Sequence, residues 1–159
     1  MNWINIPALI IVVLMLLPNV IYAIKLKSFE NKCKNKAMNI LEQVGRYSSM
    51  FFMVFNIGLY EVGFRSNIAF VIWLFLTILF LLLYWLFWFI FFKSPRTALP
   101  IILAILPSAI FITSGFILRH WLLIISGILF SIGHIYVTYQ NNHADQNESC
   151  KFKQRNDNR

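Results

Sequence analysis

Apolar residues run through this chain in five long stretches separated by short polar connections. About 20 helical residues cross a bilayer core ~30 Å thick, with a usable range of about 17–25. The stretches are continuously apolar, which favours helices, because the strands of a membrane barrel alternate between apolar and polar residues. The pattern therefore predicts an all-α, polytopic transmembrane helix bundle with five spans, over residues 3–24, 48–64, 68–92, 97–118 and 121–139.

The third stretch gives the strongest signal and the second gives the weakest. No charged residue occurs between Ile68 and Phe92, whereas the stretch over 48–64 is short and contains Glu61. We expect residues 1–139 to form a single transmembrane domain.

Lysine and arginine residues are concentrated on one side of the predicted bundle. Twelve of them fall in the connection 25–47, the third connection and the carboxyl-terminal tail, against Arg65 and Arg119 on the other side. Cytoplasmic loops collect Lys and Arg, so the N-terminus is expected outside and the C-terminus inside. A cleaved signal peptide ending at Ala23 is the alternative for the first stretch, but its basic residues follow the apolar run, the reverse of a secretory signal.

The composition supports a membrane location. Hydrophobic residues make up 59% of the chain and charged residues 13%, against about 45–50% and about 25% in soluble domains. The net charge of +8 is accounted for by inside-marking residues, so nucleic acid is not expected as a partner. The abundance of Ile, Lys, Asn and Phe is typical of an AT-rich genome, and we expect a multi-pass protein of a bacterial cytoplasmic membrane.

Two cysteines, Cys33 and Cys150, fall on the predicted inner side, where thiols stay reduced. The chain has no CxxC motif and no Cys/His spacing typical of a metal site. We therefore expect no disulfide, no structural zinc and no cofactor.

Two polar segments flank the predicted spans. The connection 25–47 is basic in its first half and has apolar residues at helical spacing. It is expected on the cytoplasmic face, where it either binds anionic lipid headgroups or serves as a solvated amphipathic linker. The cytoplasmic tail 140–159 is rich in Asn and lacks apolar periodicity, so we expect it to be mobile beyond the last helical turn.

Polar residues of the predicted second span follow one helical face. Their spacings alternate between four and three along Glu42, Arg46, Ser49, Met53, Asn56 and Tyr60. Asn56 is expected ~14 Å beyond the boundary at Tyr47, near the membrane midplane. Polar groups are costly in hydrocarbon, so this face should point into the bundle. Asn56 then either joins helices by hydrogen bonds or lines a substrate cavity.

The predicted fifth span has a similar face, formed by Gly127, Ser131, His134 and Thr138. Gly127 and Ser131 are a small-xxx-small pair that permits close approach of another helix. His134 is expected in the inner half of the membrane, either as a proton acceptor or ligand contact, or as a donor to a neighbouring helix. No second histidine falls within the predicted spans, so a metal site is not expected.

Prolines interrupt the hydrogen-bond ladders of two predicted spans. Pro18 frees the carbonyl of Leu14, which Asn19 or a neighbouring helix could satisfy, and Pro107 frees that of Leu103. Pro107 either kinks its helix or breaks it into a binding site, as in transporters.

Several polar residues are expected at the depth of the inner leaflet. If their helices are neighbours, they form a polar cavity that opens to the cytoplasm. The candidate residues are Asn19, Tyr22, Arg46, Ser49, Asn56, Ser131 and His134.

Short motifs along the chain resemble an uncharacterised family of small multi-pass membrane proteins of low-GC Gram-positive bacteria. They are Pro18-Asn19-Val20-Ile21-Tyr22-Ala23, Glu42 with Gly45-Arg46-Tyr47, Pro107-Ser108 and Gly133-His134. The resemblance implies a bacterial cytoplasmic membrane and carries no known activity.

The sequence leaves three functions open. Small-molecule or ion binding, or an accessory role in transport, would use the polar cavity. A structural or partner-binding protein, acting with a second copy or another membrane protein, would use its polar residues only to join helices. A lipid-modifying enzyme is disfavoured, because the chain has no HExxH, no GxSxG and no Asp before Asp145.

Overall fold

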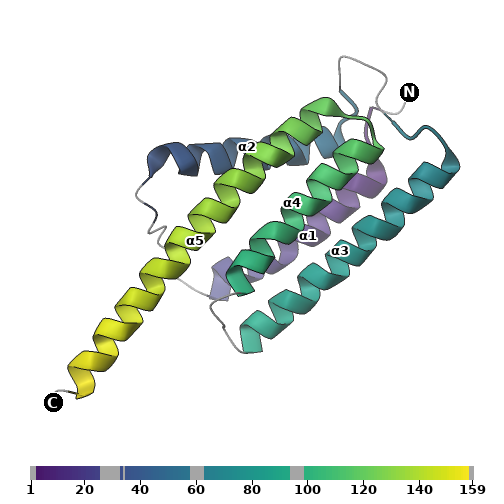
Figure 1. The fold of residues 1–159 in the computed structure, drawn as a ribbon. Helices are drawn as coiled ribbons and strands as arrows, with labels where there is room; N and C mark the ends of the chain where they lie inside the picture. The colour runs from purple at the N-terminus through teal and green to yellow at the C-terminus, as the bar shows by residue number, and fades with distance from the viewer. Residues whose placement is uncertain (1–2, 26–32, 34, 58–62, 94–98, 158–159) are drawn as a thin grey trace.

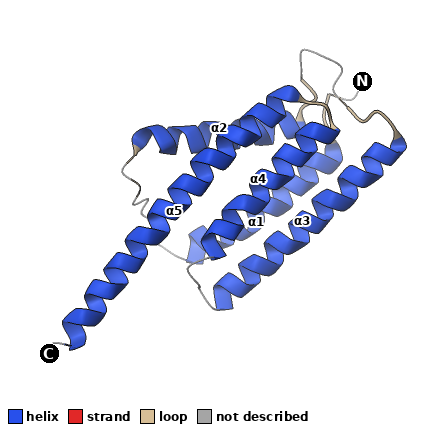
Figure 2. Cartoon of the chain, in the orientation of Figure 1, coloured by secondary structure: helices blue, strands red, loops and turns tan. Residues whose placement is uncertain are grey.

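Five α-helices form most of this chain, of which the computed structural model describes residues 3–25, 33, 35–57, 63–93 and 99–157. The helices are α1 (Ile6–Lys25), α2 (Lys36–Val54), α3 (Asn67–Lys93), α4 (Leu99–Ile117) and α5 (Trp121–Asp157). Figure 2 shows helices and loops throughout the described residues, with one isolated backbone bridge between Ile4 and Phe55. The prediction of an all-α fold is confirmed.

Four of the helices, α1, α3, α4 and α5, are long and apolar enough to cross a membrane. α1, α3 and α4 begin and end close to the predicted spans, and α5 begins at the predicted residue. Four helices of this kind indicate a multi-pass membrane protein.

Successive helices run up and down the bundle (Figure 1). α1 and α3 start at the end where the N label lies, α4 returns to it, and α5 leads away to the C label. α2 lies across α5, inclined to the other helices, and its last turn reaches the end where α1 begins. Around the bundle, α2 packs on α5, α5 on α4, α4 on α3 and α3 on α1, and α1 contacts α2.

The prediction of a helical span over 48–64 is wrong at both ends. α2 begins at Lys36, where the Asn35 side chain accepts hydrogen bonds from Ala37 N and Met38 N and so caps the helix. It ends at Val54, because the following backbone is extended and pairs with the segment before α1: Asn5 N donates to Val54 O at 2.8 Å. Residues 58–62 of the predicted span lie outside the described residues.

The earlier start of α2 also changes the basic connection. Residues 36–47 belong to α2 rather than to a connection of 25–47, so Arg46 lies inside a helix. Residues 26–32 and 34 lie outside the described residues.

α2 is apolar on its outer side and polar on its inner side. Glu42 and Ser49 are buried against the rest of the bundle. The exposed residues after the first turn of α2 are mostly large and apolar, with Gln43 as the polar one among Ile40, Gln43, Val44, Tyr47 and Phe51. This polarity is the reverse of that of a helix on a water-soluble domain, and it is typical of a helix that faces lipid.

α5 does not end at the predicted boundary of residue 139 but continues to Asp157. After Gly133 this helix contains neither glycine nor proline, and extending an existing helix needs no new nucleation. The polar segment 140–157 is therefore a helical continuation of the last span.

Both prolines lie within continuous helices. The Leu14 carbonyl, freed by Pro18, accepts a hydrogen bond from Trp85 Nε1 of α3 at 3.2 Å, which confirms that a neighbouring helix satisfies it. α4 continues as one helix through Pro107, and Ser108 Oγ donates to the Ala104 carbonyl at 3.1 Å. The interpretation of Pro107 as a broken-helix site is therefore wrong.

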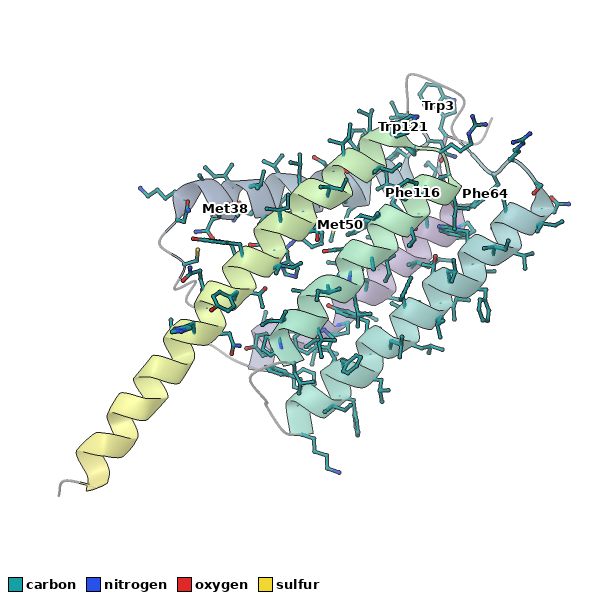
Figure 3. All side chains as sticks on the ribbon, in the orientation of Figure 1. Trp3, Met38, Met50, Phe64, Phe116 and Trp121 are labelled. Carbon is teal, nitrogen blue, oxygen red and sulfur yellow. The ribbon has the colours of Figure 1, made fainter. Side chains whose placement is uncertain are left out.

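Aromatic residues gather at the end of the bundle where α1 and α3 begin. Trp3, Phe64, Phe116 and Trp121 all lie there in Figure 3. Trp3, Phe116 and Trp121 are exposed, as expected for an aromatic belt at a membrane interface.

Candidate functional site

Glycines set the distance between α2 and α5 where the two helices cross. A Cβ atom on Gly45 would lie 2.5 Å from the backbone nitrogen of Phe130, and one on Gly133 would lie 2.6 Å from that of Glu42. Backbone atoms cannot move aside as a side chain can, so only glycine fits at these two positions. The close approach brings the polar face of α2 directly against α5.

Three ionisable residues meet at this crossing: Glu42 and Arg46 of α2 and His134 of α5, which we call the ionisable cluster. His134 Nδ1 lies 2.8 Å from Glu42 Oε1, and Arg46 Nη2 donates to the same carboxylate oxygen. The side chain of Glu42 is 10% exposed, that of His134 21% and that of Arg46 37%. The carboxylate is thus the buried centre, and the two basic groups flank it.

Phe130 supports both basic groups. Its ring stacks on the His134 ring with centroids 4.8 Å apart, and the Arg46 guanidinium lies 5.9 Å from its centroid. The same ring contacts Phe111 of α4 edge-on, with centroids 5.7 Å apart. Aromatic packing therefore fixes the orientation of the cluster relative to α4.

The hydrogen bond to Glu42 also determines which nitrogen of His134 is available. An ionised carboxylate only accepts hydrogen bonds, so Nδ1 carries the hydrogen that lies between the two residues. In the neutral imidazole the lone pair is then on Nε2.

The cluster lies well inside the bundle. By helix rise, His134 is ~20 Å along α5 from Trp121, and Arg46 is ~12 Å before the end of α2. Both distances place the ionisable groups of the cluster about two turns or more from these helix ends. Such groups are expensive in a membrane and are usually functional.

Sequence reasoning assigned Glu42 to the polar face but not to the candidate cavity. The carboxylate that orients the His134 imidazole comes from α2, not from the helix of His134 itself. One feature of the sequence indicates the pairing of Glu42 with His134: each lies near a glycine that permits close helix approach. Gly45 is three residues after Glu42, and Gly133 is directly before His134.

The remaining candidate residues of the two helices lie near the cluster. Ser49 is fully buried, and within the described part of the chain its hydroxyl oxygen has no hydrogen-bond partner. Ser131 is half-buried on α5, one turn before His134. Gly127 faces α4, because its Cβ would lie 3.1 Å from Ile112 Cγ1, which confirms that Gly127 permits close approach of another helix. The predicted common face of Gly127 and His134 is wrong, because His134 faces Glu42 of α2.

A second polar contact joins α1 and α3. Asn19 Nδ2 donates to the hydroxyl of the buried Tyr84 at 3.0 Å. Tyr22 packs against Trp88, with ring centroids 5.2 Å apart. This contact therefore joins α1 to α3, whereas the ionisable cluster joins α2 to α5.

Asn56 lies apart from both groups. It follows α2 at the end where α1 begins, and its N–H donates to Trp3 O at 3.0 Å. The expected midplane position of Asn56 is therefore wrong, because the helix that would have carried it inward ends at Val54.

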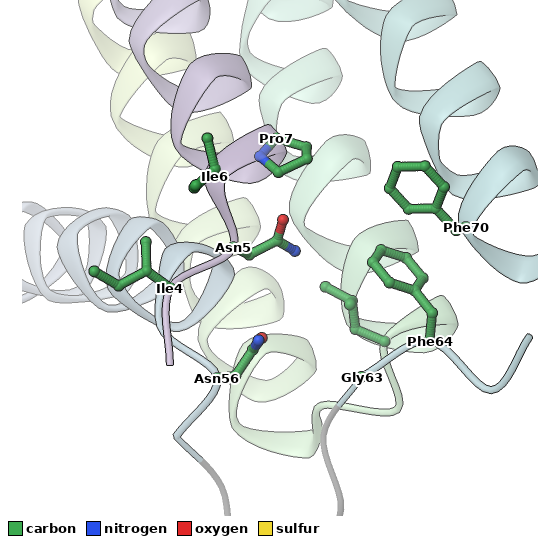
Figure 4. A pocket seen from close by; sticks show the side chains of 9 residues that line it. Ile4, Asn5, Ile6, Pro7, Asn56, Gly63, Phe64 and Phe70 are labelled. Carbon is green, nitrogen blue, oxygen red and sulfur yellow. The ribbon is translucent and has the colours of Figure 1, made fainter. Parts of the chain in front are cut away.

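Asn56 lines a shallow pocket of about 270 Å³ at this end (Figure 4). Asn5 is the other polar side chain of the pocket, and its Oδ1 accepts from Ala8 N at 3.2 Å and caps α1. Phe64 and Phe70 line it from the far side, edge-to-face with centroids 5.0 Å apart.

His120 connects α4 to α5 and caps α5. Its Nδ1 accepts a hydrogen bond from Leu123 N at 3.3 Å, and the residue is 1% exposed. Burial lowers the pKa of His120 below its ordinary value, because the charged imidazolium is disfavoured there. The neutral form is also the one that can accept at Nδ1.

Among the described residues no group of three or more His, Cys, Asp or Glu side chains is placed to hold a metal ion. No family model, curated protein or solved structure matches the chain.

Proposed function

We propose that this chain crosses the membrane with five segments, of which α2 is the least apolar, with its N-terminus outside and its C-terminus in the cytoplasm. The apolar outer side of α2 supports this arrangement, because lipid would cover it while α5 covers the polar side. The N and C labels lie at opposite ends of the bundle, as an odd number of crossings requires (Figure 1). Eleven of the 14 Lys and Arg residues would then lie inside, with Arg46 within α2.

The location in a bacterial cytoplasmic membrane is part of the same proposal, and it rests on the composition and on the resemblance to the uncharacterised family. The basic residues before α2 would contact anionic lipid headgroups.

Cysteine labelling tests the orientation. In a background with Cys33→Ser and Cys150→Ser, Arg65→Cys should react with an impermeant maleimide in intact cells. Cys150 alone should react only after permeabilisation. The opposite pattern would overturn the orientation.

The proposed activity is the binding of a small ligand or ion at the ionisable cluster. This binding is either the activity of the protein itself or part of an accessory role in transport. The observation that carries it is the buried carboxylate of Glu42, held between an imidazole and a guanidinium in the interior of the bundle. Helix association in lipid is achieved elsewhere in this chain with glycines and neutral hydrogen bonds, such as Trp73 Nε1 to Ser114 Oγ at 2.9 Å. Three ionisable groups at one crossing exceed what that task needs.

Thermal unfolding of the purified protein in mild detergent tests this activity. A ligand that binds the folded state raises the apparent stability by mass action, so a panel of metabolites, cations, anions and lipids should contain at least one stabilising compound. His134→Gln should remove that stabilisation while the protein still accumulates. Asn56→Leu is the matched control and should leave it intact, because Asn56 lies at the other end of α2.

A purely structural role is the second candidate, favoured by the position of the cluster at the tightest helix crossing. In that case no compound of the panel would stabilise the protein, and His134→Gln would reduce accumulation. A second copy or another membrane protein would then be the partner.

A further inference from the structure

Arg46 has hydrogen-bonding capacity that its partners do not use. A guanidinium has five N–H donors in a planar fork, and within the described part of the chain one hydrogen bond, to Glu42, is formed. Its side chain is 37% exposed, far more than that of Glu42. The fork can therefore engage a second planar acceptor without giving up its first.

The charges of the cluster limit what that acceptor can be. Arg46 and Glu42 neutralise each other, so an added anion would leave one uncompensated negative charge in a region of low dielectric. A proton on His134 Nε2 supplies one positive charge and leaves the bond to Glu42 in place. One negative charge can be balanced in this way, whereas a phosphate dianion cannot.

We propose that the ionisable cluster binds a small monocarboxylate together with one proton, an inference that rests on the proposed binding function. The two carboxylate oxygens accept hydrogen bonds from the free edge of the Arg46 guanidinium, which matches them in geometry. The proton adds to His134 Nε2. The site is then electrically neutral both when empty and when occupied.

The helices packed against α5 supply no competing charge. α2 presents Glu42 and Arg46 to His134, and α4 contains no ionisable residue. A cation is a poor occupant, because the single carboxylate of the cluster already has two basic partners.

Two measurements on the full-length protein in mild detergent test the inference. In the first, thermal unfolding is followed with sodium acetate, propionate, chloride and phosphate at equal sodium concentration. Acetate and propionate should stabilise the protein, and their affinity should rise about tenfold when the pH is lowered by one unit from 8, since one proton is taken up per anion. In the second, a pH-indicator dye in weak buffer should report uptake of about one proton per carboxylate bound.

Four variants assign the effect to the cluster. Arg46→Lys keeps the charge but loses the fork, and should weaken acetate binding at least about tenfold. His134→Gln still donates to Glu42 and should abolish proton uptake. Arg65→Gln and His143→Gln are the matched controls, exposed residues outside the cluster, and should bind as the unaltered protein does.

The outcomes separate this inference from the proposed function. If a cation or neutral compound stabilises the protein and carboxylates do not, the binding function stands and the inference is wrong. Carboxylate binding without proton uptake, or equal stabilisation by chloride, also overturns the inference. The proton measurement on the unaltered protein is decisive even if a variant fails to fold, and failure of every compound in the wider panel would overturn the binding function itself.

Discussion

α5 packs against α2 on one side and against α4 on the other, and the two contacts are built differently. Both contacts use one glycine from each helix. These are Gly45 of α2 with Gly133 of α5, and Gly115 of α4 with Gly127 of α5. The contact with α2 adds the ionisable cluster. The contact with α4 is apolar, with Ile124 against Gly115.

The chain connections explain this difference. α4 and α5 are joined by a tight turn in which His120 N donates to Gly115 O and Arg119 N to Phe116 O, a Schellman motif. The turn fixes the register of the two helices locally. α2 is far from α5 in sequence, and apolar packing gives little preference for one register over another when lipid is equally apolar. Gly45 and Gly133 therefore set where α2 meets α5, and the ionisable cluster lies at that crossing.

The largest expected effect is the loss of the carboxylate at the first contact. Glu42→Leu leaves Arg46 and His134 without their shared acceptor, and the free energy of unfolding in detergent should fall by about 3 kcal/mol. Adding Arg46→Met and His134→Leu should restore most of it, because no charge then remains unpaired, but should not restore ligand binding. A loss below about 1 kcal/mol in the single variant would show that the cluster does not hold the two helices together.

The second largest effect is the cost of adding a methyl group, which should differ between the α2–α5 and α4–α5 contacts. Gly45→Ala places a methyl group against the backbone of Phe130 and should cost about 3 kcal/mol. Gly127→Ala meets Ile112 Cγ1 at 3.1 Å and no backbone atom closer than 3.4 Å, so a small shift of Ile112 accommodates the methyl group and the change should cost about 1 kcal/mol or less. Thermal unfolding of both variants measures the two losses of stability. Equal losses would contradict the close backbone approach of α2 and α5.

Acid should lower the stability of the α4–α5 contact, because His120 lies in the turn that joins these two helices. Because the pKa of His120 is lower in the folded state than its ordinary value of about 6.5, the unfolded chain binds this proton more readily. Stability is therefore fully present above pH ~6.5 and is lost as the pH falls below it. His120→Asn keeps a capping side chain and should lose less stability than the unaltered protein between pH 7.5 and 5.5. The same pH dependence of stability in both proteins would exclude His120 as the cause.

The smallest expected effect is a gain. Arg119 has φ 55°, a left-handed conformation that glycine adopts without cost. Arg119→Gly should therefore raise stability by about 0.5 kcal/mol. Arg65→Gly, which also removes an exposed arginine, is the control and should give no gain.

The sequence predicts best where a single property decides the structure. The bounds of α3 follow from an uninterrupted apolar run, and those of α1 and α4 follow in the same way. α2 was misplaced because its polar and apolar residues alternate at helical spacing, so no continuous run marks its ends. Its true ends depend on the Asn35 cap and on backbone pairing with Asn5.

Part of the candidate site was predictable too. Arg46, Ser49 and His134 were selected because polar residues in a membrane helix face inward, and the structure places all three near the α2–α5 contact. The pairing of Glu42 with His134, 92 positions apart, was not predictable from spacing. It depends on how far two helices slide along each other before their glycines meet the opposite backbone.

The dependence of α2 on the last helix has a consequence for how the protein is made. α2 is synthesised before α5, so in the proposed five-span arrangement Glu42 and Arg46 would enter the bilayer without the histidine that later covers them. The nascent bundle would then carry an uncovered charged surface until α5 is made. A chain that stops before α5 would expose this surface permanently, as a marker by which membrane proteases could distinguish unfinished copies from finished ones.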